Sequence, residues 1–410
     1  MTPITRSSAA AQDAADPFAA TRARFSLPAG AIYLDGNSLG ALPRHVPARL
    51  AEVVTQQWGE DLITSWNRHG WFDLPRRLGE RLGRLIGAEP ASVMVCDTIS
   101  ANVYKLLAAA LDLRPERKVI LSDTGNFPSD LYMAQGLIRH LGRGHELKLV
   151  APEDVEAAIG PDTAVVLLTE SDYRTARLHD MAAITATAHR AGALTIWDLA
   201  HTAGVFPVNL AAAGADFAAG CTYKYLNGGP GAPAFLYVRP DLQDQVRSPL
   251  SGWWSHEAPF AFETDYRPAT GMLRQQCGTQ AILSLAALDA ALDVWDGVDL
   301  HALRAKSVAL CRLFIERVEQ LSGLKLAGPR DLAMRGSHVS FHCAEGYAVM
   351  QALIAERITG DFRAPDLIRF GFAPLYNSFT EAYDAAEALG RILATGSWNE
   401  PRFTTRKAVT

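Results

Sequence analysis

The sequence predicts an α/β protein in which a mostly parallel, doubly wound sheet forms a large domain and a smaller α+β domain follows. Between about residues 90 and 240, short apolar runs alternate with segments of helical spacing, which is typical of parallel strands covered by helices. From about residue 279 the chain changes to long Ala/Leu-rich helical segments. We therefore expect an N-terminal segment (1–45) that packs with the small domain, a large domain (46–278) and a small C-terminal domain (279–410).

Individual elements follow from periodicity and from the residues that bound each run. Residues 1–30 form an irregular lead-in, and 33–40 are typical of a short strand and turn. Apolar residues at helical spacing predict helices at 46–58, 73–87, 100–113, 129–141, 153–159, 181–190, 279–295 and 300–320. Short apolar runs predict strands at 93–96, 119–122, 147–150, 164–168, 194–197, 217–221, 234–238 and 337–342.

Composition narrows the class of protein. The 410 residues are 49% hydrophobic and 20% charged with a net charge of −5, as in an ordinary globular enzyme. The sequence has no basic block that would predict a nucleic acid partner. It also has no apolar run of about 18 residues that would predict a membrane span. The N-terminus lacks the apolar core of a signal peptide. Five scattered cysteines without a CxxC pair favour a reducing compartment, so the cytoplasm is the expected location.

Asp198 and Lys224 are the most informative pair. Asp198 ends the apolar run that begins at Ala193, and Lys224 lies in an aromatic stretch before a Gly-rich loop. A partly desolvated lysine can form a Schiff base. A carboxylate at a strand tip can keep a pyridine nitrogen protonated. The pair therefore indicates pyridoxal 5'-phosphate (PLP) chemistry.

Two junctions between a strand and a helix are candidate cofactor contacts. Thr98-Ile-Ser-Ala-Asn102 can seat a phosphate at a helix N-terminus, or can simply supply an N-cap. In Asn126-Phe-Pro-Ser-Asp130, Phe127 can stack on a flat ring while Ser129 and Asp130 cap a helix. The alternative is an ordinary N-terminus that begins with proline.

Further candidates follow the predicted strands. Thr169 opens a charged loop after a buried strand, and such loops carry either function or solvated charge. His201 follows Asp198 closely and has either a site role or a structural one. Tyr223, beside Lys224, is a candidate acid or base, with core packing as the alternative.

Four features lie further along the chain. Trp253, in a Gly-Trp-Trp cluster, fits aromatic recognition or a subunit contact. Thr279 is an N-cap of the following helix or a second phosphate donor. Arg369, within an apolar run, fits a carboxylate clamp or a structural salt bridge. His338 and His342 share one side of a strand but are too few to hold a metal, so we expect no metal site.

Together these segments resemble the kynureninase family, PLP-dependent enzymes of the aspartate aminotransferase fold (fold type I). The resemblance spans residues 33–376, nearly the whole chain. Seven motifs match in order: Tyr33-Leu-Asp-Gly-Asn-Ser-Leu-Gly, Phe127-Pro-Ser-Asp, Asp172-Tyr-Arg-Thr, Asp198-Leu-Ala-His, Tyr223-Lys-Tyr-Leu-Asn, Gly252-Trp-Trp and Arg369-Phe-Gly.

The resemblance implies a role for each matched residue. Lys224 would hold PLP, Asp198 would pair with the pyridine nitrogen, and His201 would support Asp198. Arg369 would clamp the substrate α-carboxylate, and Tyr223 would be a candidate acid at the β-carbon. The remaining cofactor contacts would come from Ile99, Ser100, Phe127, Pro128, Ser129, Asp130, Thr169 and Tyr223 and, across a homodimer interface with shared active sites, from Trp253 and Thr279.

The implied reaction is hydrolysis of L-kynurenine to anthranilate and L-alanine in tryptophan catabolism, with 3-hydroxykynurenine as a second candidate substrate. Thr279 stands where forms that prefer the 3-hydroxylated substrate carry Asn, which favours L-kynurenine. Gln280-Ala281 and Ser255 depart from the family pattern at positions that the resemblance assigns to the aryl pocket, and their effect on that pocket stays open. A cysteine desulfurase of the same fold and a non-catalytic binding protein are the alternatives, and neither fits the motifs as well.

Overall fold

The computed structural model describes residues 4–405, which divide into two compact units. One unit contains residues 46–172 and 179–292, and the other contains residues 4–45, 173–178 and 293–405. We call them the sheet unit and the terminal unit, and we describe each by itself. Helix α10 (Ile282–Ala291), which the sequence analysis groups with the C-terminal domain, belongs to the sheet unit. Its Ala287, Ala290 and Ala291 pack with Val46 in one apolar cluster.

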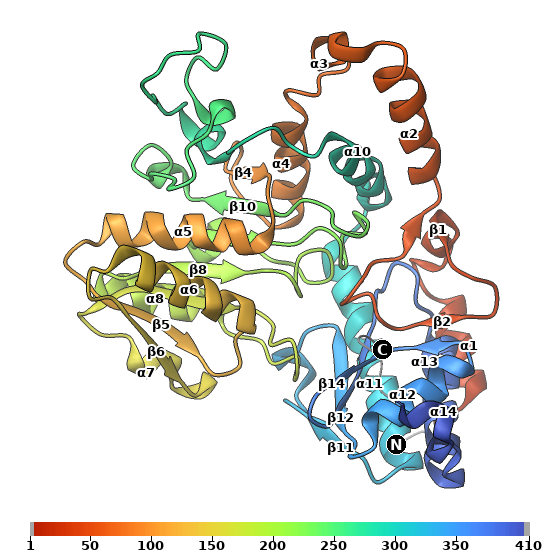
Figure 1. Cartoon of the computed structure of the whole chain (residues 1–410). Helices are drawn as coiled ribbons and strands as arrows, with labels where there is room; N and C mark the ends of the chain where they lie inside the picture. Colours follow the sequence, from red (N-terminus) through yellow and green to blue (C-terminus); the bar gives the residue numbers. More distant parts are fainter. Residues whose placement is uncertain (1–3, 406–410) are drawn as a thin grey trace. The chain divides into compact units, whose positions relative to one another are not determined.

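A seven-stranded sheet forms the centre of the described sheet unit (Figure 1). Only β10 runs antiparallel to its neighbours, so the prediction of a mostly parallel sheet is confirmed. Every residue of β7 is buried, as expected for a strand covered by helices on both faces. In spatial order the strands are β4 (Val93–Val95), β10 (Phe235–Val238), β9 (Phe217–Gly220), β8 (Leu194–Asp198), β7 (Thr163–Thr169), β5 (Val119–Asp123) and β6 (Glu146–Val150).

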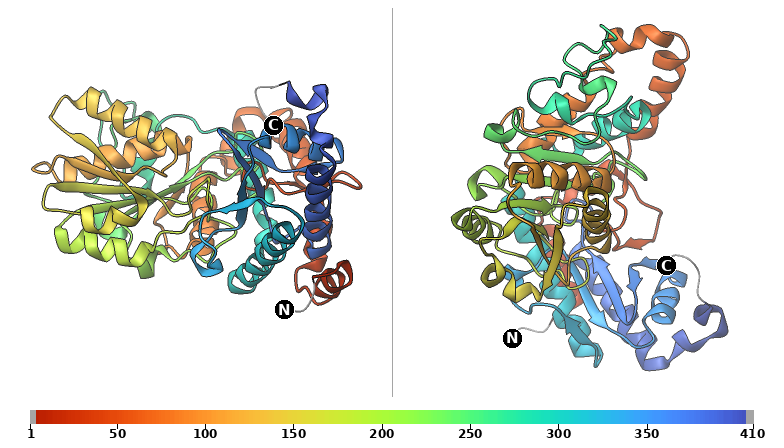
Figure 2. Two further views of the ribbon diagram at one scale, coloured as in Figure 1. Left: turned by 90° about the horizontal axis from the view of Figure 1, so that it is seen from below. Right: turned by 60° about the vertical axis from the view of Figure 1, so that its left-hand side comes forward.

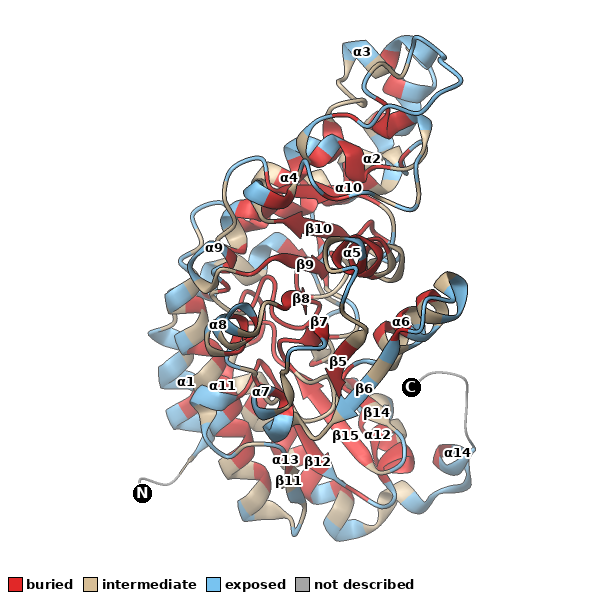
Figure 3. Cartoon of the chain, turned by 90° about the vertical axis from the view of Figure 1, so that its left-hand side faces the viewer, coloured by how far each residue is buried: buried red, intermediate tan, exposed pale blue. Residues whose placement is uncertain are grey.

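Helices cover both faces of this sheet. Figure 3 shows α5 and α6 on one face and α8 on the other, with buried strands between them. Predicted and observed helices agree closely, although the predicted helix 46–58 continues beyond α2 as a π-helix over Val53–Trp58. The helices of this unit are α2 (Val46–Glu52), α3 (Ser65–Arg68), α4 (Leu74–Leu85), α5 (Ile99–Leu113), α6 (Pro128–Leu141), α7 (Val155–Ala158), α8 (Met181–Ala191), α9 (Leu210–Ala213) and α10.

The terminal unit is an α+β layer structure. Its antiparallel sheet has the order β11 (Lys325–Ala327), β12 (His338–His342), β15 (Leu367–Gly371) and β14 (Asp361–Arg363). Short pairs join β1 (Phe25–Ser26) to β3 (Leu42–Pro43) and β2 (Ile32–Tyr33) to β13 (Ile358–Thr359). Long helices α11 (Leu300–Leu321) and α13 (Phe379–Thr395) lie side by side (Figure 2), and α12 (Gly346–Ala355) and α14 (Pro401–Thr404) complete the layer.

Residues 4–30 are more regular in structure than the sequence suggests. Arg6–Ala14 form helix α1, which begins with a capping box at Thr5 and packs on α13. Ala9 is buried in the core of the terminal unit. The small, weakly apolar face of α1 explains why periodicity did not reveal this helix.

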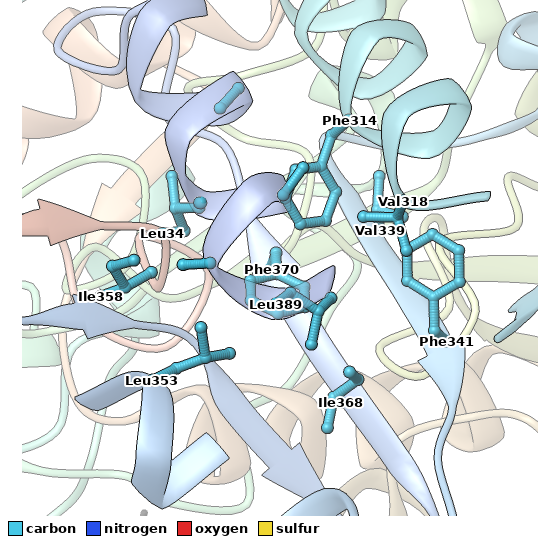
Figure 4. Packing of buried hydrophobic residues seen from close by; sticks show 14 of the residues in the cluster. Leu34, Phe314, Val318, Val339, Phe341, Leu353, Ile358, Ile368, Phe370 and Leu389 are labelled. Carbon is cyan, nitrogen blue, oxygen red and sulfur yellow. The ribbon is translucent and has the colours of Figure 1, made fainter. Parts of the chain in front are cut away.

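The core of the terminal unit positions the strand that carries Arg369. Ile368 and Phe370 pack among Leu34, Phe314 and Leu389 (Figure 4). Because side chains alternate along a strand, Arg369 lies on the face of the sheet opposite this core.

Candidate active site

Polar side chains gather where the parallel strands of the sheet unit end. Thr169 and Asp198 are the last residues of β7 and β8 and are directly paired in register. The junctions of β4 with α5 and of β5 with α6 also follow strand ends. In open α/β sheets, ligands bind at this edge. The prediction that Asp198 and Thr169 lie at strand ends is therefore confirmed.

Asp198 is buried and accepts hydrogen bonds. Its Oδ1 accepts from the backbone N–H of Ala200 at 2.7 Å, and its Oδ2 lies 3.4 Å from Thr169 Oγ1. Burial raises the pKa of Asp198, and the charge of Lys224 opposes this shift, together with hydrogen bonds from Ala200, Thr169 and Asp130. The charge of Lys224 and these hydrogen bonds favour the carboxylate form against the effect of burial, and the carboxylate is the form that can pair with a protonated pyridine nitrogen.

Asp130 is the protonated partner in this carboxyl pair. Burial raises its pKa well above the usual range, the neighbouring Asp198 raises it further, and Lys224 opposes the shift. Asp130 Oδ2 is buried and has no hydrogen-bond partner among residues 4–405. Two buried carboxyl groups that interact directly cannot both ionise easily. We therefore assign the proton to Asp130 and the negative charge to Asp198.

Lys224 lies between two aromatic rings. Its Nζ is 5.8 Å from the centroid of the Phe127 ring and 5.8 Å from that of Tyr223. Phe127 remains 39% exposed, so one face of its ring is available to a flat ligand. Lys224 is half-buried, as expected for an amine that must be both desolvated and reachable.

Two long helices begin at this site and can hold a phosphate. Ile99 is the first residue of α5 and Pro128 the first of α6. The hydroxyls of Ser100 and Ser129, one in each first turn, are 3.0 Å apart. Free N–H groups and the helix dipole favour an anion at the N-terminus of each of these two helices.

The capping roles differ in part from the expectation. Thr98 caps α5 through a hydrogen bond from the Ala101 N–H at 3.3 Å. For α6, the prediction that Ser129 and Asp130 act as caps is wrong, because the N-cap residue is Phe127 and it makes no side-chain cap. Pro128 starts the helix without needing a donor, which leaves Ser129 and Asp130 inside its first turn.

Asn126 is a site residue whose role the sequence analysis missed. Its Oδ1 accepts from Thr169 Oγ1 at 2.5 Å and from the Phe127 N–H at 2.7 Å. Its Nδ2 donates to Ser122 Oγ at 2.9 Å. Asn126 therefore ties Phe127 to the end of β7. A buried asparagine directly before Phe-Pro, after a strand, is the signal that could have revealed it.

Three further predicted residues belong to the sheet unit. His201 is buried in the turn that follows Asp198. Trp253 and Thr279 are exposed, and Trp253 packs with Phe72 and Phe260. The expectation that Thr279 caps a helix is wrong, because α10 begins only at Ile282 and its N-cap residue is Ala281.

Arg369 belongs to the terminal unit, where it is surrounded by polar groups. Its Nε donates to Asp361 Oδ1 at 2.9 Å and its Nη2 donates to Asp361 Oδ2, so the two form a bidentate pair. Nη2 also donates to Ser38 Oγ at 3.0 Å, and Nη1 donates to the Tyr173 carbonyl at 2.5 Å. The alternative of a structural salt bridge is therefore confirmed by the pairing with Asp361, and the role of Arg369 as a carboxylate clamp stays a prediction.

The two strand histidines are not brought into a shared site. His338 is buried, whereas His342 is on the surface and its Nδ1 lies 2.8 Å from Asp366 Oδ2. No group of three or more His, Cys, Asp or Glu suited to a metal occurs among residues 4–405. Within the same described range, none of the helices combines the length and apolar character needed to cross a membrane.

These side chains fit PLP on structural grounds. Asp198 offers a buried carboxylate, Lys224 an amine over an aromatic ring, and two helix N-termini offer hydroxyls for a phosphate. The unpartnered Asp130 Oδ2 is a buried polar atom that a bound ligand would satisfy.

Comparison with solved structures shows that this chain has the fold of PLP-dependent enzymes of fold type I. A cysteine desulfurase from Thermococcus onnurineus NA1 superposes with a TM-score of 0.78 at 20% identity, covering 92% of this chain and 98% of that chain. A C-DES variant with glycine covalently linked to its PLP cofactor has a TM-score of 0.78 at 18% identity, covering 90% and 98%. At such identities the likeness shows the fold alone.

Sequence comparison identifies the family. Kynureninase from Pseudomonas fluorescens is 53% identical over 414 residues, covering 99% of this chain and 100% of the relative. Kynureninase from Burkholderia pseudomallei is 52% identical with the same coverage. The family model for the kynureninase C-terminal domain matches residues 303–389. The chain therefore belongs to the kynureninase family, as its seven ordered motifs predicted, and its cofactor is PLP.

Proposed function

We propose that this protein hydrolyses L-kynurenine to anthranilate and L-alanine, and that it serves tryptophan catabolism in the cytoplasm. The observation that carries the proposal is identity above 50% to kynureninases over the whole chain. The placement of Asp198 at the end of β8, with Lys224 over Phe127, supports it. The five cysteines are free thiols, which supports a reducing compartment.

In this proposal the residues at the strand ends hold the cofactor. Lys224 forms the covalent link, Asp198 pairs with the pyridine nitrogen, and Phe127 stacks on the ring. Thr169, Asp130 and His201 support Asp198, and Pro128 sets the start of α6. The first turns of the two helices supply phosphate contacts through Ile99, Ser100 and Ser129, with Tyr223 beside them.

PLP, when bound, supplies an electron sink for cleavage of the carbon–carbon bond. Lys224 Nζ removes the substrate α-proton, which requires an amine close to the cofactor and shielded from bulk water. Tyr223 is the proposed acid that protonates the β-carbon. Arg369 binds the substrate α-carboxylate, while Asp361 holds the guanidinium in one orientation. Pre-organisation of this kind limits the entropy lost on substrate binding.

We further propose a homodimer in which each subunit completes the other's site through Trp253 and Thr279. Large apolar side chains are exposed on two segments of the sheet unit, with Phe262 82% exposed and Ile63 77% exposed. Trp253 and Phe260, whose ring centroids are 6.0 Å apart, are also exposed and contact each other. Exposed aromatic clusters of this kind are typical of subunit contacts.

Anthranilate formation tests the reaction. Purified protein loaded with PLP should be yellow and should release fluorescent anthranilate from L-kynurenine, whereas Lys224→Ala should bind PLP without turnover. Yellow protein that releases no anthranilate would contradict the proposed reaction. Comparison of kcat/KM for L-kynurenine and 3-hydroxykynurenine then tests the preference expected from Thr279.

A mixing experiment tests the shared site. Lys224→Ala and a Trp253→Ala/Thr279→Ala variant should each have little activity as separate homodimers. After subunit exchange, the mixed dimer contains one site with both Lys224 and the donated residues, so activity should return. A stable, fully active monomer, or subunit exchange without recovery, would contradict the proposal.

A further inference from the structure

A second carboxyl group, Asp35, accompanies Asp361 beside Arg369. Asp361 and Arg369 are direct neighbours across β14 and β15. Asp35 forms an isolated backbone β-bridge with Gly371, which is two residues after Arg369. Arg363 Nη2 also donates to Asp361 Oδ2 at 2.6 Å. All these residues belong to the terminal unit. Two carboxyl groups and two guanidinium groups therefore share one cluster.

Several polar atoms in this cluster are unsatisfied. Within residues 4–405, no hydrogen-bond partner is found for Asp35 Oδ1, for either amide atom of Asn37, or for the hydroxyl of Ser340. Asn37 is 1% exposed and packs on Gly371, and Ser340 is the neighbour of Arg369 across β12. Buried polar groups without partners are uncommon in native proteins. These atoms can therefore hydrogen-bond to a polar ligand or to water at this cluster.

The charges determine which ligand the cluster can hold. Arg363 and Arg369 contribute two positive charges and Asp361 one negative charge. If Asp35 is ionised the cluster is neutral, and if Asp35 is protonated the cluster carries one net positive charge. A single carboxylate is matched only in the second state, because like charges at close range repel.

The surroundings of Asp35 make its protonated state accessible. Burial raises the pKa of Asp35 to about 7 and the charge of Asp361 raises it too, whereas Arg369, hydrogen bonding to Ser38 and Arg363 oppose the shift. For Asp361, burial raises the pKa, but Arg369 and Arg363 outweigh burial and the pKa is lowered. Tyr33, which has Asp35 and Asp361 as its charged neighbours, stays neutral because burial raises its pKa. Asp35 is therefore the group in this cluster that exchanges a proton.

We propose that Asp35 is a proton-linked residue of the substrate-carboxylate site: it is protonated when Arg369 holds a carboxylate, and its ionisation weakens binding of that carboxylate. A protonated Asp35 can donate a hydrogen bond to a carboxylate oxygen, whereas an ionised Asp35 repels it. Substrate binding then takes up one proton. This inference rests on the proposed role of Arg369 in substrate binding.

Binding of a substrate analogue without the α-amino group tests the inference. 4-(2-Aminophenyl)-4-oxobutanoate keeps the carboxylate and the aryl ketone but cannot form a covalent link to the cofactor. For the PLP-loaded wild-type enzyme, we expect its Kd to rise at least about tenfold between pH 6.5 and 8.5, because the binding-competent protonated fraction falls. Calorimetry in buffers of different ionisation enthalpy should show proton uptake near pH 7.5.

Asp35→Asn should remove this dependence. Its Kd should change little over the same pH range and should be lower than that of the wild type at pH 8.5, because no negative charge forms. Asp366→Asn is the matched control, since Asp366 is an aspartate in the loop before β15 that pairs with His342 at the surface. This control should keep the wild-type pH dependence.

The outcomes separate this inference from the proposed reaction. Asp35→Asn with wild-type pH dependence, or with weaker binding than wild type at pH 8.5, would overturn the role of Asp35. Absence of proton uptake by the wild-type enzyme would also overturn it, and this measurement needs no variant to fold. Wild-type protein that binds the analogue with proton uptake but releases no anthranilate would refute the proposed reaction alone.

Discussion

Thr169 and Asp198 end neighbouring parallel strands as paired residues, and Thr169 Oγ1 lies 3.4 Å from Asp198 Oδ2 and 2.5 Å from Asn126 Oδ1. One hydroxyl thus connects the proposed partner of the pyridine nitrogen with the residue that orders Phe127. Side chains from three successive strand ends are joined by this contact, although they are far apart in the sequence. The integrity of the cofactor site should therefore depend on this hydroxyl.

Replacing Thr169 tests this dependence. In Thr169→Val the hydroxyl is lost without a change in side-chain shape, and its short hydrogen bond to the neutral amide oxygen of Asn126 contributes about 0.5–1.5 kcal/mol. We expect the Kd for PLP to rise roughly 2- to 10-fold on that basis. Titration of the apoenzyme with PLP measures this Kd. Thr169→Ser keeps the hydroxyl and should bind like wild type, so equal losses in both variants would argue against the hydroxyl.

Phe127 should contribute to PLP binding through its ring. Stacking between aromatic rings contributes about 0.5–1.5 kcal/mol beyond burial, so Phe127→Leu should raise the Kd for PLP by up to about tenfold. Tyr132→Leu is the control, because Tyr132 is an exposed aromatic residue of the same helix. The same PLP titration measures both variants. Equal Kd values for Phe127→Leu and wild type would exclude stacking.

Lys105 should be essential for the stability of the sheet unit. This buried amine lies 2.8 Å from Asp97 Oδ2 and 2.6 Å from the Gln275 carbonyl, so it connects the segments before Ile99 and before Thr279. Lys105→Met leaves Asp97 without its partner and should cost about 3–5 kcal/mol. Urea unfolding measures the loss. The double variant Lys105→Met/Asp97→Asn should recover part of it, and an unchanged midpoint for Lys105→Met would contradict the prediction.

Glu170 should make stability depend on pH. Its side chain is buried, and burial raises its pKa to about 7, with a hydrogen bond to Thr202 opposing the shift. The folded state then binds more protons than the unfolded state from about pH 4.5 to 7. The contribution of Glu170 to the free energy of unfolding should fall across this range as pH rises, by up to about 3 kcal/mol.

Glu170→Gln removes this titration. The variant should be more stable than wild type at pH 8, and the difference should shrink towards pH 5. Glu153→Gln, at an exposed glutamate, should follow the wild-type curve. Urea midpoints measured from pH 5 to 8 give the comparison. Parallel curves for Glu170→Gln and wild type would show that Glu170 does not titrate in this range.

Local signals predicted most of the fold correctly. Continuous apolar runs located β7 and β8, and helical periodicity located α5, α6 and α11, because burial on one or both faces determines these patterns directly. Helix α1 was missed because its apolar face is small. The start of α10 was placed three residues early, since its composition alone does not mark where the first turn forms.

The sequence by itself determined the family, the PLP cofactor and the chemical types of the site residues, because ordered motifs preserve side-chain identity and spacing. Only the tertiary structure decided which of these groups form ion pairs, hydrogen bonds and interacting carboxyl pairs. Asp130 and Asp198 form one carboxyl pair, Asp361 occupies one edge of Arg369, and Asn126 joins Thr169 to Phe127. These relationships depend on burial and on distances of a few ångströms between segments remote in sequence. Such quantities exist only once the strands are paired.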